Sequence, residues 1–253
     1  MLFAVDVGNT QTVLGLFEGE RLAAHWRIST HSALTGDELR TTVTGLLALD
    51  ALSWSDISGV ILASVVPRVT AAWEEATASS SCDLLIVGPG LKTGMPIRYD
   101  NPHEVGADRI VNGVAAFALL GGPVIVVDFG TATTIDVIAE DGAYLGGAIA
   151  PGVETSAEAL FSKAARLSKV DLVAPPRVIG SNTRESMQAG LMLGEAAMVD
   201  GLVRRAWVEL GVETPVIATG GLATRMAPLC ETVASADGDL TLKGLRMIYD
   251  LNR

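Results

Sequence analysis

Two short segments of the sequence each carry an aspartate and a glycine, separated by one residue, at the end of an apolar run. Asp6 and Gly8 form the first pair, and Asp128 and Gly130 form the second, about halfway along the chain. A carboxylate at the end of a buried strand can hold a hydrated Mg²⁺ or an alkali cation against an anion. Glycine lets the backbone approach phosphate oxygens, and successive N–H groups of the turn donate to them. The repeated turn therefore predicts a phosphorylated ligand.

One such turn is weak support for this interpretation, because Asp-x-Gly turns are common in ordinary hairpins. Here both copies are followed by a second β-rich run, at 12–17 and at 133–138. Two matched hairpins, one in each half, favour two halves that fold alike around a shared ligand. Further donors for that ligand are the hydroxyls of Thr10, Thr12 and Thr131.

A third glycine turn, Gly220-Gly221, follows the apolar run at 216–218. Paired glycines that open a helix let a flat ring or a ribose lie against the backbone. A plain strand-to-helix turn explains the same residues equally well, so both interpretations stay open at this point.

The densest polar cluster, 100–109, leads directly into an apolar helix, and Asp108 falls in the first turn of that helix. In phosphoryl transfer a carboxylate there would orient the attacking hydroxyl, and Arg109 would pair with a substrate carboxylate or a phosphoryl group. Alternatively, Asp108 only complements the helix dipole, an effect of roughly 0.3–1 kcal/mol that would lower its pKa.

Several common site patterns are absent from the sequence. It contains no GxxxxGK[ST], no GxGxxG after a first strand, no GxSxG and no HExxH. The two cysteines, Cys82 and Cys230, are far apart, and with three scattered histidines they form no zinc pattern.

The composition is that of a globular chain of 253 residues, with 49% apolar and 19% charged residues. The net charge of −11 argues against non-specific binding to nucleic acid or to an anionic membrane. The apolar N-terminus reads as a first strand rather than a signal peptide, and no apolar stretch reaches the roughly 18 residues of a membrane span.

Each half is expected to hold three hairpin strands followed by alternating helices and strands, which indicates a mixed sheet with helices on its faces. The boundary should fall near 121–123. In the first half we expect strands at 2–6, 12–17, 22–28, 57–66 and 83–87, and helices at 35–49, 69–78 and 106–120. In the second half we expect strands ending at 128 and covering 133–138, 143–149 and 215–218, and helices at 153–166, at 182–210 and from about 241.

The expected helix at 182–210 is apolar nearly all round, with small residues spaced along it. Such a helix is buried, either within the core of its own chain or in a subunit interface. The sequence leaves both possibilities open.

Taken together, these motifs resemble the acetate kinase, sugar kinase, Hsp70 and actin superfamily, and within it the type III pantothenate kinases over the full length. The resemblance implies a duplicated ribonuclease H-like (actin-like) α/β fold with a cleft between the halves. Residues 1–120 would carry the first phosphate loop and the base, and residues 121–253 the second phosphate loop, the adenosine turn and a dimer helix. The segments that carry the resemblance are Asp6-Val7-Gly8-Asn9-Thr10, Ala63-Ser64-Val65-Val66-Pro67, Asn101-Pro102, Gly106-Ala107-Asp108-Arg109, Asp128-Phe129-Gly130-Thr131-Ala132-Thr133-Thr134, Gly146-Gly147-Ala148-Ile149-Ala150-Pro151-Gly152 and Thr219-Gly220-Gly221.

The resemblance further implies ATP-dependent phosphorylation of the 4′-hydroxyl of pantothenate, the first step of coenzyme A biosynthesis. Asp108 would be the catalytic base, Asp6 would face the Mg²⁺-phosphate, and Asp128 would hold K⁺ or NH₄⁺. The implied nucleotide-binding residues are Asp6, Val7, Gly8, Asn9, Thr10, Gln11, Thr12, Val13 and Thr131, and the implied pantothenate-binding residues are Tyr99, Gly106, Ala107, Asp108, Arg109 and Thr183.

A cytoplasmic homodimer is also implied, with the pocket near the subunit interface. Two other functions stay open at the level of sequence. One is a non-catalytic, regulatory (transcriptional accessory) homologue, against which the intact Asp6, Asp108, Arg109 and Asp128 argue. The other is a different small-molecule kinase of the same superfamily.

Overall fold

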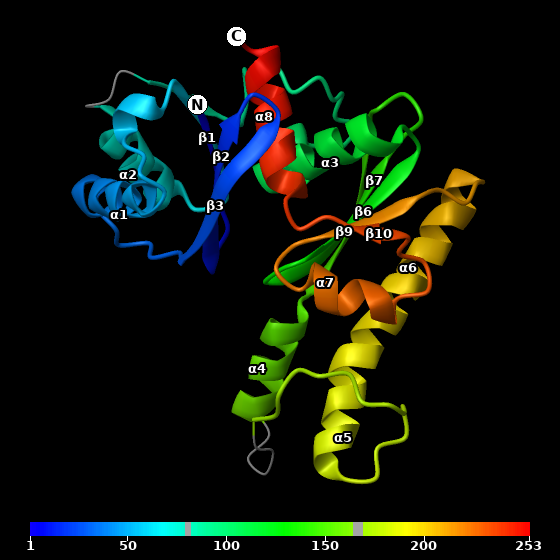
Figure 1. Cartoon of the computed structure of the whole chain (residues 1–253). Coiled ribbons are helices and arrows are strands. Elements are labelled where there is room, and N and C mark those ends of the chain that lie inside the picture. Colours follow the sequence, from blue (N-terminus) through cyan, green and yellow to red (C-terminus); the bar gives the residue numbers. More distant parts are fainter. Residues whose placement is uncertain (79–81, 164–168) are drawn as a thin grey trace. The chain divides into compact units, whose positions relative to one another are not determined.

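The computed structural model describes residues 1–78, 82–163 and 169–253, which divide into two compact units (Figure 1). The first unit comprises Met1–Met95, Asp100–Ala115 and Leu240–Arg253, and the second comprises Pro96–Tyr99 and Ala116–Asp239. Each unit is built around one five-stranded sheet.

The sheet of the first unit has the strand order β3-β2-β1-β4-β5. The strand β1 lies at its centre, antiparallel to β2 and parallel to β4. The strands are β1 (Leu2–Val7), β2 (Gln11–Glu18), β3 (Arg21–Ser29), β4 (Gly59–Ser64) and β5 (Asp83–Ile86).

The sheet of the second unit repeats this topology strand for strand, in the order β8-β7-β6-β9-β10. Its central strand β6 is antiparallel to β7 and parallel to β9. Each sheet also has a register shift between its second and third strands, at Leu16/Phe17 and at Val137/Ile138. The strands are β6 (Val124–Phe129), β7 (Ala132–Ile138), β8 (Tyr144–Pro151), β9 (Val216–Thr219) and β10 (Ser235–Ala236). The expected duplication of a mixed sheet is confirmed.

Helices α1 (Gly36–Leu49) and α2 (Pro67–Ala78) cover one face of the first sheet. Helix α1 begins where the sequence predicts, because Thr35 and Glu38 form a capping box. The Thr35 side chain accepts from the Glu38 backbone N–H at 3.3 Å, and Glu38 Oε2 accepts from the Thr35 N–H at 2.9 Å. Such reciprocal caps satisfy N–H groups that the first helical turn leaves without partners.

The other face of the first sheet packs against the C-terminal helix α8 (Leu240–Leu251) and the start of α3 (Ala107–Leu120). Leu242, Leu245 and Ile248 of α8 are buried in one cluster with Leu2 and Ala4 of β1. Burial of this apolar stripe places the C-terminal helix in the first unit, whereas the expected halves put residues 240–253 in the second. The units differ from the expected halves in a second place, because residues 96–99 lie in the second unit.

The core of the second unit lies between its sheet and helices α4 (Val153–Lys163), α6 (Gly194–Leu210) and α7 (Ala223–Met226). Helix α4 matches the expected helix at 153–166 through residue 163, and its expected last residues lie outside the described ones. The long helix expected at 182–210 is found as α5 (Thr183–Gln188), a π-helical turn (Ala189–Leu193) and α6 in direct succession. Helix α7 follows the Gly220-Gly221 turn, as both interpretations of that turn require, whereas strand β10 was not expected from the sequence.

Candidate active-site residues

The first Asp-x-Gly turn joins β1 to β2 as the sequence predicts. Asp6 lies near the end of β1, where it pairs in register with Val13 of β2. The Gly8 N–H donates to the Gln11 carbonyl oxygen at 3.0 Å, which closes the turn. A Cβ on Gly8 would stand 3.1 Å from that same oxygen, so glycine relieves a tight contact here.

Thr30, the residue directly after β3, is hydrogen-bonded to this turn. The Thr30 N–H donates to the Thr10 carbonyl oxygen at 2.9 Å, and the hydroxyls of Thr30 and Thr12 are hydrogen-bonded at 2.9 Å. Thr12 is buried and Thr10 is exposed. Thr10 and Thr12 were both expected to donate hydroxyls to a ligand, but the Thr12 hydroxyl is already hydrogen-bonded to Thr30 within the fold.

The second turn, between β6 and β7, is one residue shorter. The Gly130 N–H donates to the Ala132 carbonyl oxygen at 3.1 Å. The carbonyl oxygen of Thr131 accepts from the Gly152 N–H at 3.0 Å and from the Thr155 hydroxyl at 2.6 Å. Thr131 is thus an exposed residue whose backbone is fixed by the start of α4.

The glycine turn after β9 lies directly against the second turn. Gly220 has φ +93°, and a Cβ there would stand 2.2 Å from Asp128 Oδ1 and 2.7 Å from the Phe129 carbonyl oxygen. The preceding residue, Thr219, is fully buried, and its hydroxyl has no hydrogen-bond partner. Only glycine permits this approach of the backbone to the carboxylate, so the turn does more than connect a strand to a helix.

Asp128 and Thr219 occupy paired positions on two parallel strands, and their side chains consequently share a face of the sheet. A carboxylate and a hydroxyl oxygen are donors that hard cations prefer. The described residues include no group of three or more His, Cys, Asp or Glu side chains suited to a metal ion. Asp128 and Thr219 together therefore offer a carboxylate and a hydroxyl oxygen on one face of the sheet.

Asp108 lies in the first turn of α3, as expected, with its Oδ1 accepting from the Arg109 N–H at 2.9 Å. Burial raises the pKa of the Asp108 carboxyl, and this effect outweighs the N–H and the positive charge of Arg109, which both lower it. The expectation that the helix dipole would lower this pKa is therefore wrong, because burial was not visible in the sequence. Arg109 itself is buried.

The loop before α3 is shaped to admit the Asp108 side chain. A Cβ on Gly106 would stand 2.4 Å from Asp108 Oδ1. Asn101 accepts from the His103 N–H at 3.3 Å, and its amide donates to Glu104 at 2.8 Å. Residues 101–104 of the polar cluster therefore form a capped turn, whereas Arg109 is buried and Asp108 is partly buried.

Tyr99 is joined to the second sheet through Tyr144. The two rings lie 6.2 Å apart, and the segment before Tyr99 runs along β8, where the Tyr144 N–H donates to the Pro96 carbonyl oxygen at 2.8 Å. Tyr144 in turn donates its hydroxyl to buried Asp136 at 2.8 Å, and Thr134 donates to the same carboxyl at 2.9 Å. The ring contact with Tyr144 thus connects Tyr99 to a row of hydrogen-bonded polar side chains, Tyr144, Asp136 and Thr134. The sequence did not indicate this row.

That row of polar side chains ends beside Asp128, because Thr134 is the register partner of Asp128 in β7. Its signal in the sequence is the alternation of β7, where Thr134 and Asp136 interrupt the apolar Ile135 and Val137. Two successive polar residues on one face of a strand predict a polar partner on the neighbouring strand.

Thr183 is the first residue of α5, and Asn182 caps this helix by accepting from the Glu185 N–H at 3.0 Å. It is exposed. Helix α5 lies at the end of α6 that points away from the sheet of its unit (Figure 1). The described contacts do not join Thr183 to Tyr99.

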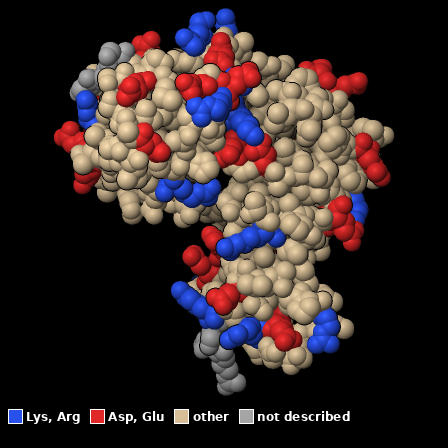
Figure 2. Space-filling view, in the orientation of Figure 1, with Lys and Arg blue, Asp and Glu red and all other residues tan. Residues whose placement is uncertain are grey.

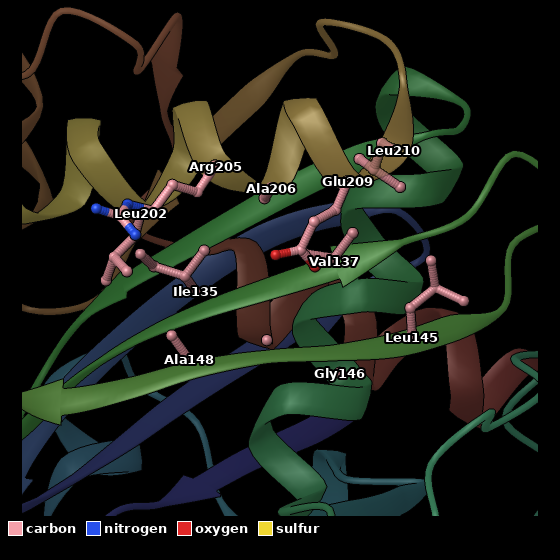
Figure 3. Close-up of a pocket in the computed structure, with 11 residues that line it drawn as sticks. Ile135, Val137, Leu145, Gly146, Ala148, Leu202, Arg205, Ala206, Glu209 and Leu210 are labelled. Atoms are coloured by element: carbon pink, nitrogen blue, oxygen red, sulfur yellow. The ribbon is translucent and has the colours of Figure 1, made fainter.

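An apolar groove of about 410 Å³ lies between α6 and strands β7 and β8. Figure 3 shows Leu202, Ala206 and Leu210 of the helix facing Ile135 and Val137 of the sheet. Apart from Gly146, Gly147 and Ala148 of a family-like segment, its lining contains none of the residues singled out for chemistry.

Comparison with known proteins gives one family and one fold. The family model for type III pantothenate kinase matches residues 2–205. The chain is 51% identical over 253 residues to the type III pantothenate kinase of Moorella thermoacetica, and 50% identical over 254 residues to that of Syntrophotalea carbinolica. Both alignments cover 100% of this chain and 100% of the relative.

Two solved structures resemble the fold at low sequence identity. Component A of the (R)-2-hydroxyglutaryl-CoA dehydratase of Acidaminococcus fermentans has a TM-score of 0.58 at 14% identity, over 100% of this chain and 99% of the other. The inorganic polyphosphate/ATP-glucomannokinase of an Arthrobacter strain has a TM-score of 0.53 at 14% identity, over the same shares. These likenesses show the fold alone, that of actin-like ATPases and sugar kinases, as the sequence predicts.

Proposed function

The chain belongs to the type III pantothenate kinase family, and from that premise we propose that it transfers the γ-phosphoryl group of ATP to the 4′-hydroxyl of pantothenate. The product, 4′-phosphopantothenate, begins coenzyme A biosynthesis. The observation that carries the proposal within the chain is the Asp108 carboxyl, partly buried beside Arg109 at the start of α3.

Asp108 is proposed as the base that accepts the proton of the substrate hydroxyl. The raised pKa of this carboxyl brings its basicity closer to neutral pH, which favours general base catalysis. In a loose phosphoryl-transfer transition state, the carboxylate mainly orients the hydroxyl toward the phosphorus. Arg109 is placed to bind a carboxylate or phosphoryl group through paired N–H donors. Tyr99, Gly106, Ala107 and Thr183 are proposed to complete the pantothenate site.

The first turn, Asp6–Val13, and Thr131 of the second turn are proposed to bind the phosphates of ATP. The glycine turns allow backbone N–H groups to approach anionic oxygens, which compensates locally for an acidic chain. Mg²⁺, held at Asp6, would neutralise charge on the transferring phosphates. Asp6 suits this role because it lies near the carboxyl end of the central strand β1, next to the turn, and is only partly buried.

Asp128 is proposed to hold a monovalent cation, K⁺ or NH₄⁺. The support is the set of oxygen donors around it, including the buried Thr219 hydroxyl that has no partner in the fold. A buried hydroxyl without a partner costs free energy, on the order of 1–3 kcal/mol in protein mutational data. A cation at this position would accept that oxygen as a ligand and remove the cost.

We also propose that the protein is a cytoplasmic homodimer and that α5 and α6 contribute to its interface. Gly190, Gly194 and Ala197 form an exposed stripe along this helical run. A Cβ at Gly190, Gly194 or Gly201 would meet nothing within 4 Å, so packing inside the chain does not require these glycines. Small residues on a helix face allow the backbone of another helix to approach closely. No helix among the described residues has the length and apolar character needed to cross a membrane.

The regulatory alternative is not favoured, because full-length relatives at about half identity are named as kinases and Asp6, Asp108, Arg109 and Asp128 are all present. Acidic and basic side chains are interspersed on the face shown in Figure 2. The net charge of −11 argues against non-specific binding to nucleic acid, and we propose none.

A coupled assay of ADP release tests the proposed function. The purified protein, with Mg·ATP and K⁺, is given pantothenate, a panel of sugars, or acetate. We expect ADP release with pantothenate alone, and 4′-phosphopantothenate as the product by mass spectrometry. Release with a sugar or acetate but not with pantothenate would support another kinase of the superfamily, and release with none would support the regulatory alternative.

A further inference from the structure

The first phosphate turn has no cation of its own. Residues 6–13 contain one carboxylate and neither lysine nor arginine, in a chain of net charge −11. A triphosphate that approaches this turn meets backbone N–H groups and hydroxyls, but also the repulsion of an acidic protein. Proteins commonly bind phosphate groups through arginine, because its planar guanidinium can donate two parallel hydrogen bonds. A basic side chain at this turn must come from outside residues 6–13.

Arg27, on β3, lies in the same cross-strand row as Asp6. Asp6 of β1 pairs with Val13 of β2, and Val13 pairs with Arg27 of β3. Residues paired in this way project from the same face of a sheet. Neighbouring strands are about 4.8 Å apart, so the Cα atoms of Asp6 and Arg27 are separated by roughly 10 Å, with Val13 of β2 between them.

The Arg27 side chain is hydrogen-bonded to the first residue of β2, directly after the turn. Its Nη1 donates to Gln11 Oε1 at 2.8 Å, and this contact uses one of the five N–H donors of the guanidinium. Among the described residues, Arg27 forms no ion pair, and it is exposed. Other arginines differ in this respect, since each of the following pairs with a carboxylate: Arg21 with Glu18, Arg98 with Asp141, Arg204 with Glu231 and Arg246 with Asp250.

The backbone under Arg27 is held to the same turn. Thr30, three residues further along, bonds through its N–H to Thr10 and through its hydroxyl to Thr12, each at 2.9 Å. Residues 27–30 therefore lie beside the first turn and are hydrogen-bonded to it through Thr30. Arg27 is the charged residue of this segment.

We propose that Arg27 is a nucleotide-binding residue, whose guanidinium contacts the phosphates that the first turn receives. The inference rests on the proposed use of ATP. It assigns the positive charge of the first phosphate site to a strand outside the Asp-x-Gly hairpin. Gln11 is then a positioning residue, because its amide oxygen accepts a hydrogen bond from the guanidinium and holds it next to the turn before the nucleotide binds.

The test is the affinity of the full-length protein for Mg·ATP and for adenosine, measured by calorimetry on Arg27→Gln, Arg27→Lys, Gln11→Ala and the wild type. Arg21→Gln is the matched control, because Arg21 lies on the same strand and its ion pair with Glu18 is exposed. We expect Arg27→Gln to raise the Kd for Mg·ATP about tenfold, the effect of removing a hydrogen bond to a charged group. Adenosine binding should not change, Arg27→Lys should recover part of the loss, and Arg21→Gln should behave as the wild type.

Wild-type affinity for Mg·ATP in Arg27→Gln would overturn the inference. Equal losses for Mg·ATP and adenosine would also overturn it, because Arg27 would then only support the hairpin. A third contrary result is a Gln11→Ala loss as large as that of Arg27→Gln, with no recovery in Arg27→Lys. Nucleotide binding is read directly, so failure of the wild type to phosphorylate pantothenate would count against the proposed function and not against this assignment.

Discussion

The Asp128 carboxyl and the Thr219 hydroxyl lie on adjacent parallel strands, on one face of the second sheet, and Gly220 brings the backbone against the same carboxyl. At Asp6, the paired position on the parallel strand β4 is Ala63, which carries no hydroxyl. The two Asp-x-Gly turns are thus alike in sequence but differ in length and surroundings, which supports distinct roles for their aspartates.

Replacing Thr219 by valine tests the proposed monovalent cation at Asp128. K⁺ should raise the Tm of the wild type relative to Na⁺, because a ligand that binds only the folded state stabilises it. In Thr219→Val the response to K⁺ should shrink, while stability in Na⁺ stays equal or rises, because a buried hydroxyl without a partner has been removed. Differential scanning fluorimetry and activity in K⁺ and Na⁺ measure both effects. An Asp128→Asn variant with a full K⁺ response would exclude the site.

Replacing Asp108 by asparagine should abolish turnover and leave Mg·ATP binding nearly intact, because the change removes the proton acceptor and keeps the shape of the side chain. In the wild type, the acidic limb of kcat/KM against pH should lie above the ordinary range of aspartate, as burial raises the pKa of Asp108. Steady-state kinetics and calorimetry provide the measurements. Turnover like that of the wild type in Asp108→Asn would remove Asp108 from the role of base.

The same substitution has a defined effect on stability. Because the folded-state pKa of Asp108 is raised, its stabilising contribution is present below the unfolded pKa and is lost as pH rises through the folded value. Asp108→Asn should therefore be more stable than the wild type at neutral pH. The difference should vanish below about pH 4, near the unfolded pKa of aspartate. Urea unfolding at several pH values checks this trend, and a constant difference would contradict it.

Glu195 gives a second prediction of the same kind. It is buried at the start of α6, and burial raises its pKa although the Thr133 hydroxyl donates to Oε1 at 2.5 Å. The wild type should lose stability relative to Glu195→Gln as pH rises from acid to neutral, since the charged form is the costly one. Thr133→Val, which leaves the carboxyl without this donor, should be less stable by about 1–3 kcal/mol. Equal unfolding curves for Glu195→Gln and the wild type across this pH range would contradict the assignment.

The exposed glycines of the long helix allow a test of the proposed dimer. Gly194→Trp should yield a monomer by light scattering, with an unchanged circular dichroism spectrum, because the new side chain enters open space in the chain itself and blocks a second helix. Gly194→Ala is the control. It should increase stability by up to about 1 kcal/mol through helix propensity and should not force a monomer. A Gly194→Trp variant that stays dimeric would show that the interface lies elsewhere.

Much of the fold could be predicted because local signals and global structure agree. The first strand of each hairpin is an apolar run that ends at a glycine turn, and Thr35 and Glu38 mark the start of α1. Strand β10 has only two residues, both exposed, which is too short for a periodic pattern. The apolar stripe of α8 predicted a helix, but its sequence position could not reveal which sheet the helix covers.

The site was predicted less completely, for a physical reason. Residue types and spacing suggested Asp6, Asp108 and Asp128, yet burial, which sets the pKa of Asp108, depends on packing by distant residues. Thr219 belongs to a local motif, but its pairing with Asp128, like the position of Arg27 in the row of Asp6, depends on strand register. Such neighbours become visible only when the register is known.

Helix α8 also has a consequence for the order in which the protein forms. Residues 240–253 complete the core around Leu2 and Ala4, at the opposite end of the chain. A chain is synthesised from its N-terminus, so one apolar face of the first sheet lacks this cover until residues 240–253 emerge. Residues 96–99 and 116–239, which form the second unit, have by then all been made. We therefore expect the first half of the nascent protein to mature last, and to be the part that depends most on chaperones.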